Sequence, residues 1–243
     1  MKKMLVLGIM FLGFQLSSNA QLDALKKAVS GGGGNSSLGS GLSSDQIVSG
    51  LKEALTIGTE KSASKLSAAD GFFKDAVVKV LMPPEAQKVE KTLRSVGMGQ
   101  LVDNAILSMN RAAEDASKSA APIFVDAVKN MSITDALNIL RGSDTAATSY
   151  LKKSTTPQLT TAFRPVIDAS LQKTDATKYW KSVVDAYNGL PTTFKKVNSD
   201  LPAYVTQKAI SGIFYYVAQE EAKIRKDPAA QVTGLLKQVF GGK

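Results

Sequence analysis

The sequence predicts an all-α fold, a single bundle-like domain of roughly eight to ten helices. Apolar residues recur at spacings of three and four along most of the chain, which is the period of an amphipathic helix. Residues that suit helix starts separate these stretches. Only residues 77–81 (VVKVL) are typical of a β-strand, and a single strand cannot form a sheet.

The first twenty residues have the pattern of a secretory signal peptide. Two lysines precede an apolar run over residues 4–16 and the sequence SSNA, whose small residues suit cleavage after Ala20. The run is shorter than the roughly 20 apolar residues of a transmembrane helix. We therefore expect an exported protein, periplasmic or extracellular, whose mature chain begins at Gln21 and contains no transmembrane segment.

Residues 21–42 predict a short helix followed by a linker. Residues 22–29 (LDALKKAV) can form two helical turns. Residues 30–41 (SGGGGNSSLGSG) have the composition of a flexible linker, without side chains that could form a core. The all-α domain is therefore expected over residues 43–241.

The first half of this domain contains three helix signals. Ser43 or Ser44 can cap a helix whose apolar side carries Ile47, Val48, Leu51, Leu55 and Leu66. Pro84 suits the first turn of a second helix, which is expected to end near Gly97. A third helix, from Gly99 to about residue 118, has a contact face of small and apolar residues: Val102, Ala105, Ile106, Met109, Ala112, Ala113 and Ala116.

The second half is divided by further caps and by prolines. Residues 132–135 (SITD) resemble a capping box, and this helix is expected to stop at Gly142 in a left-handed conformation. Ser143 or Asp144 can start the next helix. Thr156-Pro157 is expected to start another, which Pro165 should bend or break. The remaining N-cap candidates are Asp175, Asp200 and Asp227, and the last helix carries Val232, Leu235, Leu236, Val239 and Phe240.

The chain is basic, with a formal net charge of +9. Without Lys2 and Lys3, 28 basic and 21 acidic side chains remain. A basic exported protein can be drawn to anionic surfaces such as lipid headgroups, although these charges are scattered. No nucleic-acid-binding motif is present, so we expect no nucleic-acid partner.

The chain contains neither histidine nor cysteine. This composition excludes Ser-His-Asp and Cys-His catalysis, and zinc or haem held by those residues. The pattern Ser-x-x-Lys occurs four times, at Ser49, Ser62, Ser149 and Ser170, but the companion motifs of serine-lysine enzymes are missing. The sequence therefore predicts no catalytic residue, no cofactor and no metal ligand, and leaves a carboxylate-bound ion formally open.

Two groups of charged residues lie beside apolar helix faces. Glu220 and Glu221 border the apolar stripe of their helix, and Arg225 follows Glu221 at the spacing of a same-face ion pair. Arg111 and Glu114 are three residues apart. One interpretation is that these residues form ion pairs that fix helix register. The other is a polar cluster at the floor of a cavity, holding a ligand headgroup or a metal ion.

The aromatic residues of the second half also have two interpretations. Tyr179, Trp180 and Tyr187 lie on one predicted helix, and residues 214–216 (FYY) lie on another. They either pack in the core or line an apolar pocket.

Several segments together resemble a family of bacterial exported proteins, the domain of unknown function 4197 family. The resemblance spans nearly the whole folded region and is carried by SGLKEAL, MNRAAEDA, MSITDALNILRGSDTAATSYL, YVTQKAISGIF and EEAKIRKDPAAQVTGLLKQVFG. It implies an exported helical domain in bacteria. It implies no activity and no functional residues.

Together these observations favour a non-enzymatic protein of the bacterial cell envelope. We expect it to bind either an apolar or amphipathic small molecule or a protein partner. The alternative is an enzyme, with or without a metal ion, that uses Glu114, Glu220 and Glu221 with Arg111 or Arg225. An enzyme needs its charged groups to converge on an open cleft, whereas a binding protein needs an apolar cavity or groove.

Overall fold

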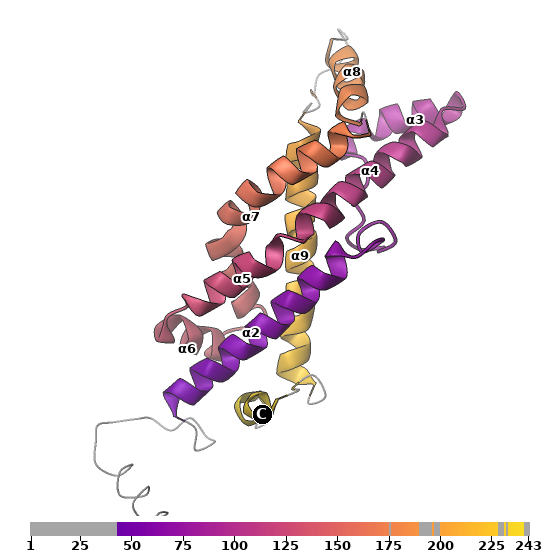
Figure 1. Cartoon of the computed structure of the whole chain (residues 1–243). Helices are drawn as coiled ribbons and strands as arrows, with labels where there is room; N and C mark the ends of the chain where they lie inside the picture. Colours follow the sequence, from indigo (N-terminus) through magenta and orange to yellow (C-terminus); the bar gives the residue numbers. More distant parts are fainter. Residues whose placement is uncertain are drawn as a thin grey trace, which may run out of the picture. The chain divides into compact units, whose positions relative to one another are not determined.

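The computed structural model describes residues 43–174, 176–189, 196, 200–227, 231 and 233–240 (Figure 1). The elements are α2 (Ser44–Ser67), the 3-10 helix η1 (Pro84–Ala86), α3 (Gln87–Ser95), α4 (Gly99–Ser117), α5 (Ala120–Lys129), α6 (Ile133–Arg141), α7 (Ala146–Gln172), α8 (Ala176–Asn188), α9 (Leu201–Lys226) and α10 (Gly234–Phe240). No strand occurs in this part of the chain, so the all-α prediction is confirmed. None of the described helices is long and apolar enough to cross a membrane. The expected signal peptide, short helix and linker lie outside the described residues.

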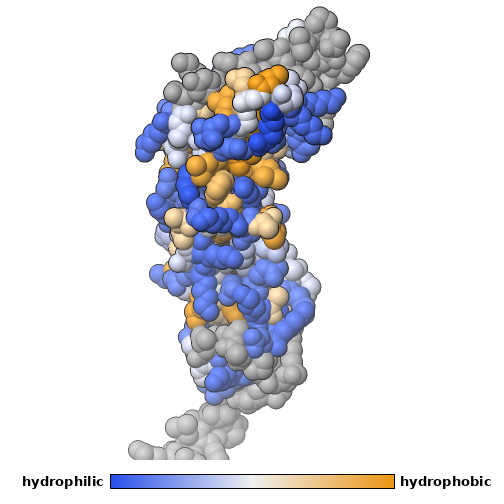
Figure 2. All heavy atoms as spheres, turned by 90° about the vertical axis from the view of Figure 1, so that its right-hand side faces the viewer, coloured by the Kyte–Doolittle hydropathy of each residue, from blue (hydrophilic) through white to orange (hydrophobic). Residues whose placement is uncertain are grey.

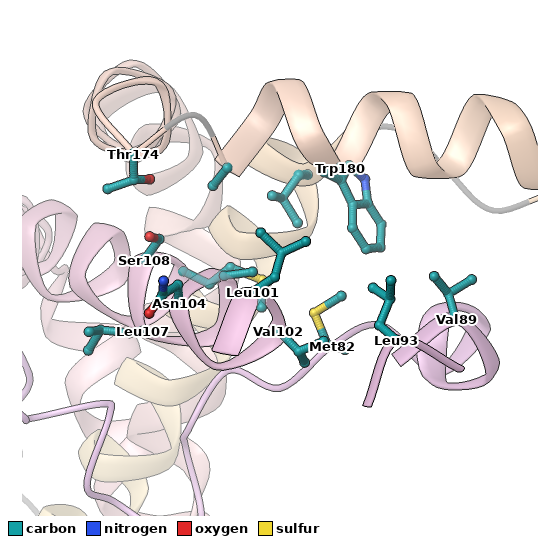
Figure 3. Close-up of a pocket in the computed structure, with 14 residues that line it drawn as sticks. Met82, Val89, Leu93, Leu101, Val102, Asn104, Leu107, Ser108, Thr174 and Trp180 are labelled. Atoms are coloured by element: carbon teal, nitrogen blue, oxygen red, sulfur yellow. The ribbon is translucent and has the colours of Figure 1, made fainter. Parts of the chain in front are cut away.

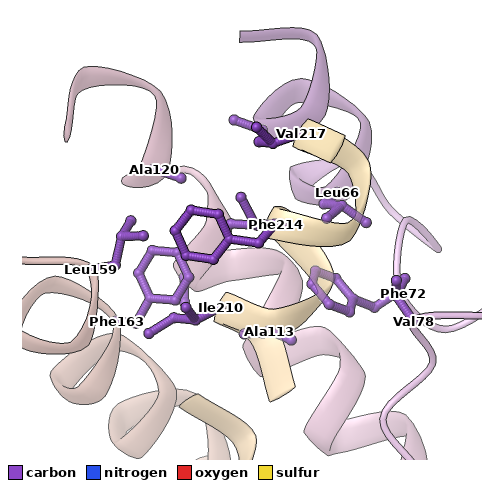
Figure 4. Packing of buried hydrophobic residues seen from close by; sticks show 14 of the residues in the cluster. Leu66, Phe72, Val78, Ala113, Ala120, Leu159, Phe163, Ile210, Phe214 and Val217 are labelled. Atoms are coloured by element: carbon purple, nitrogen blue, oxygen red, sulfur yellow. The ribbon is translucent and has the colours of Figure 1, made fainter. Parts of the chain in front are cut away.

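Helix α9 is the centre of the packing and contacts α2, α4 and α7. Its apolar face includes Ile213 and Phe214, which are both buried. Figure 4 shows Phe214 among side chains from the surrounding helices. The ring of Phe214 meets that of Phe124 from α5 edge to face, with centroids 5.7 Å apart. The largest fully buried side chains are Phe72, Phe124, Phe163, Leu66, Met109, Leu151, Leu159, Ile167, Leu171, Leu201 and Ile213.

Local caps start the helices where the sequence predicts them. The Ser43 hydroxyl accepts from the backbone N–H of Gln46, whose side chain accepts from the Ser43 N–H in return. Ser132 and Asp135 form the same reciprocal pair at the start of α6. Asp200 caps α9. The five apolar residues predicted for the core face of α2 are all buried: Ile47, Val48, Leu51, Leu55 and Leu66.

The predicted helix start at Pro157 is wrong, and Pro165 does not break the helix that contains it. Helix α7 runs without interruption from Ala146 to Gln172, with both prolines inside it. Each proline removes one hydrogen bond from the helix. Helix α7 packs on α4, α5 and α9, and this packing outweighs the cost of the lost hydrogen bonds. The residues on its buried face are Leu151, Leu159, Phe163, Ile167 and Leu171.

Two other expectations about helix ends hold only in part or not at all: α6 stops at Gly142 as predicted but without a left-handed residue there, and Asp227 does not start the last helix. Gly142 ends α6 with an extended backbone, φ −77° and ψ −173°, and not a left-handed one. A side chain at this position would meet the Ala146 Cβ at 2.6 Å, so close packing explains the glycine. Asp227 ends α9 in an extended conformation, and the last helix begins later, at Gly234. Asp175 and Val232 lie outside the described residues.

Candidate functional site

The carboxylate of Glu221 joins α9 to the ends of two other helices. Its Oε1 accepts from the backbone N–H of Ala147 at 3.0 Å, and its Oε2 accepts from that of Thr148 at 2.8 Å. Arg225 donates to Oε1 at 2.9 and 3.0 Å and also to the carbonyl of Ile139 at 2.9 Å. The side chains of Glu221 and Arg225 are only 4% and 7% exposed. Glu221 thus caps the start of α7, where backbone N–H groups have no partner within the helix.

Glu114 performs a similar task for the turn that follows α2. Its Oε1 accepts from the backbone N–H groups of Phe72 and Phe73 at 3.1 and 3.2 Å. Its Oε2 accepts from Arg111 at 2.6 Å, and Arg111 also donates to Asp70 at 2.6 Å. The hydrogen bond to Glu114, and then that to Asp70, raises the pKa of Arg111 above its ordinary value. This group therefore holds the turn on α4.

The five predicted site residues form no single cluster. The two ion pairs indicated by residue spacing, Arg111–Glu114 and Glu221–Arg225, are both present, but they hold different segments of the chain. Glu220 pairs with Lys223 at 2.7 Å and takes no part in the Glu221 contacts. Within the described residues, no group of acidic side chains could hold a metal ion. Ligand contact by these five residues stays a prediction.

The irregular segment between α2 and η1 is fixed by polar side chains from α4 and α9. Residues 77–81, which have the pattern of a strand, bond to side chains and, through the N–H of Lys79, to the carbonyl of Asp75, and not to another strand. Buried Asn110 accepts from the backbone N–H of Val80 and donates to its carbonyl, both at 2.8 Å. The Tyr204 hydroxyl donates to the carbonyl of Leu81 at 3.0 Å. Because these bonds fix the segment, they also place Met82 beside α4.

Asp75 anchors the same segment through a second polar contact. One carboxylate oxygen accepts from the backbone N–H groups of Val77 and Val78, and the other from the hydroxyl of Tyr216. Burial raises the pKa of Asp75, but the hydrogen bond from Tyr216 and those from the backbone outweigh it, so the pKa lies below its ordinary value. Burial, and then the bond to Asp75, raises the pKa of Tyr216. The ammonium of Lys65 lies 3.8 Å from the Tyr216 ring centroid.

Helix α3 forms one wall of a cavity because it packs loosely. It has no fully buried residue, and it folds back on α4 through a tight turn. Gly97 supplies the turn with a φ of +81°, a conformation that other residues rarely adopt. The apolar residues Val89 and Leu93 face α8 across the space (Figure 3).

The cavity between α3, α4 and α8 has a volume of about 580 Å³. Its apolar lining comes from these helices, from Met82 before η1 and from the start of α9: Met82, Val89, Leu93, Leu101, Val102, Ala105, Leu107, Met109, Ala176, Trp180 and Leu201. Its polar lining is Asn104, Ser108 and Thr174. No charged side chain is present among the described residues that line it, and none of the five predicted site residues does so.

One face of α4 supplies the centre of the lining. Leu101, Asn104, Ala105 and Ser108 recur at the spacing of a single helix face. The small-residue face predicted for this helix therefore has two roles. The alanines from Ala112 onward pack in the core, whereas the earlier turns, up to and including Met109, border the cavity.

Trp180 forms the opposite wall and is 6% exposed. Figure 3 shows its indole ring extending from α8 toward Leu93. Its buried N–H has no hydrogen-bond acceptor among the residues that the structure describes. In Figure 3 the indole nitrogen lies on the α8 side of the ring, and the ring carbons face Leu93. The pocket-lining interpretation of the aromatic residues therefore applies to Trp180. No pattern in the sequence of α3 predicted that this helix would line a cavity.

Apolar side chains are also exposed near the α3–α4 turn. Val96 and Met98 flank Gly97 and are 65% and 47% exposed, and Val77 and Leu81 are similarly exposed. Figure 2 shows hydrophobic residues grouped in its upper half among hydrophilic ones. These four residues do not line the cavity described above.

A family model described as "Protein of unknown function (DUF4197)" matches residues 41–241 of this chain. No curated protein and no solved structure matches it.

Proposed function

This chain belongs to the family described as Protein of unknown function (DUF4197), and we propose that it is an exported bacterial protein that binds an apolar or amphipathic small molecule. The observation that carries the proposal is the cavity between α3, α4 and α8. Its volume of about 580 Å³ lies within the range of small-molecule sites, and most of its lining is apolar. Such a lining binds a ligand by removing apolar surface from water.

Two further features of the cavity support binding without catalysis. The Glu and Arg residues that an enzyme would use are bonded to helix ends, a turn or a neighbouring lysine, and they do not converge on the cavity. The described lining offers no nucleophile with an adjacent base, since its only hydroxyls belong to Ser108 and Thr174 and no charged group accompanies them.

Export is the other part of the proposal, and it rests on the first twenty residues. The full chain, expressed in a bacterium, should be recovered from the exported fraction with an N-terminus at Gln21. N-terminal sequencing and intact mass measure this outcome. A chain that retains residues 1–20 in the cytoplasm would contradict export and leave the cavity proposal standing.

Binding can be measured through Trp180, the single tryptophan of the chain. The uncharged fluorescent probe N-phenyl-1-naphthylamine is titrated into the protein while tryptophan is excited. A probe seated in the cavity accepts energy from Trp180, so its emission should rise and saturate at one probe per chain. Emission that shows no transfer, or that never saturates, would contradict the proposal.

Matched variants locate the probe. Ala105→Phe fills the cavity and should weaken probe binding by about tenfold or more, the effect of losing roughly 1.4 kcal/mol. Ala169→Phe adds the same ring at an exposed position of α7 that does not line the cavity, and should leave binding unchanged. If Ala105→Phe lowers stability, Ser108→Leu is a second cavity-filling change. Equal binding by the parent and both cavity variants would place the probe elsewhere.

A further inference from the structure

We propose that the cavity selects an amphiphile whose polar group is uncharged, such as a monoacylglycerol, over a fatty-acid anion of equal chain length. This inference rests on the proposed function and names the ligand class of the same site. It is carried by how the polar residues of the lining are distributed.

The polar lining residues gather at one side of the cavity. In Figure 3, Asn104, Ser108 and Thr174 lie on the side opposite Val89 and Trp180. Asn104 and Thr174 are exposed, so this side forms the rim. The arrangement suits a molecule whose chain lies against α3 and α8 and whose polar group stays at the rim.

The rim offers hydrogen bonds without charge. An asparagine amide carries two N–H donors, and a hydroxyl both donates and accepts. The Thr174 hydroxyl donates to the carbonyl of Leu171 at 3.0 Å, which leaves its oxygen able to accept. The Asn104 oxygen accepts from Gln100 at 2.9 Å, which leaves its N–H groups able to donate to other partners. Hydroxyl and ester groups match such a rim.

An anionic headgroup would lack a cation in the described lining. Arg94, on the α3 wall, is bonded to Asp103 at 2.8 Å and to Glu90 at 3.0 Å. Hydrogen bonds to Asp103 and then to Glu90 raise its pKa, so these contacts favour its charged, paired form. A carboxylate held at this rim would give up part of its hydration without an ionic partner in the described lining, which is costly. Lys173 precedes Thr174 in the sequence, so Lys173 is the residue to replace when testing whether a cation near the rim binds an anionic headgroup.

The test is displacement of N-phenyl-1-naphthylamine from the parent protein at neutral pH. The competitors are 1-monododecanoylglycerol and dodecanoate, each kept below its aggregation concentration. The monoacylglycerol should displace half of the probe at a concentration at least about tenfold lower than dodecanoate needs. A tenfold ratio corresponds to the free-energy cost of leaving one polar group without a partner. Ser108→Ala should reduce this preference, and Lys173→Gln should leave it unchanged.

Each outcome separates the two proposals. Equal displacement by both competitors, or stronger displacement by dodecanoate that Lys173→Gln abolishes, overturns selection of an uncharged group while leaving the cavity a binding site. Displacement by neither competitor, with the probe bound, also overturns it. Failure of the probe itself to bind overturns the proposed function.

Discussion

Glu221 and Thr148 lie 73 residues apart in the sequence and are joined by two hydrogen bonds, one from the backbone N–H and one from the hydroxyl of Thr148, each 2.8 Å long. With Arg225 bound to the other carboxylate oxygen, these bonds connect the start of α7, the end of α6 and the last turns of α9. The junction is thus a structural cap built from residues distant in the sequence.

Replacing Glu221 by alanine should lower the free energy of unfolding by about 3–5 kcal/mol, because the buried guanidinium of Arg225 loses its carboxylate and two backbone N–H groups lose their acceptor. Urea unfolding followed by circular dichroism measures the change. Glu220→Ala is the matched control and should cost no more than about 1 kcal/mol, since Lys223, its partner, is exposed. Equal costs for the two variants would show that Glu221 does not act as the cap.

Replacing Asn110 by leucine should destabilise the protein by about 1–3 kcal/mol for each buried backbone group left unpaired. The groups are the N–H and carbonyl of Val80, which have Asn110 as their partner. The same change at exposed Asn138 on α6 is the control and should be nearly neutral. Hydrogen exchange of the Val80 amide gives a second readout, and unchanged protection in Asn110→Leu would contradict this assignment.

Gly212→Ala should destabilise the protein, whereas Gly58→Ala should be neutral or stabilising. A Cβ at Gly212 would lie 2.7 Å from a ring carbon of Phe72 and 3.3 Å from the Val78 Cβ, inside a close contact between α9 and the segment after α2. At Gly58 the nearest atom is 3.4 Å away, and alanine is the better helix former by about 1 kcal/mol. Thermal unfolding of the two variants compares them directly. The reverse order of stability would contradict this packing.

The Asp75–Tyr216 contact should make stability depend on pH at the acidic end. The folded-state pKa of Asp75 lies below its ordinary value, so its contribution is present above that value and is lost as the pH falls through the folded pKa. The difference in unfolding free energy between the parent and Asp75→Asn should therefore be constant above about pH 5 and shrink below about pH 4. Other acidic groups titrate in both proteins and cancel. A difference that grows on acidification would contradict the assigned direction.

Local signals in the sequence predicted the helices well where the cap and its partner are close neighbours. The capping pairs of Ser43 with Gln46 and of Ser132 with Asp135 need only a few residues of sequence, and both are present. Helix α7 was predicted wrongly because the cost of its prolines is local, whereas the burial of Phe163 and its neighbours depends on helices elsewhere in the chain.

The sequence likewise predicted the local part of the charged pairs, but not their tertiary contacts and not the cavity. Spacing along one helix indicated the pair of Glu221 and Arg225, but their bonds to Thr148 and Ile139 depend on tertiary structure. The cavity is formed by α3, α4 and α8, and no periodicity within one helix reports a space between three of them. Trp180 could be identified as an aromatic residue of either the core or a pocket, and only the fold decides between these roles.

The most direct test of the binding proposal is native mass spectrometry of the mature protein, purified from the exported fraction without detergent, alongside Ala105→Phe prepared in the same way. The parent should carry an added mass that disappears on denaturation and is absent or much reduced on Ala105→Phe, while Ala169→Phe retains it. A parent protein that carries no added mass and also fails to retain added 1-monododecanoylglycerol would contradict the account.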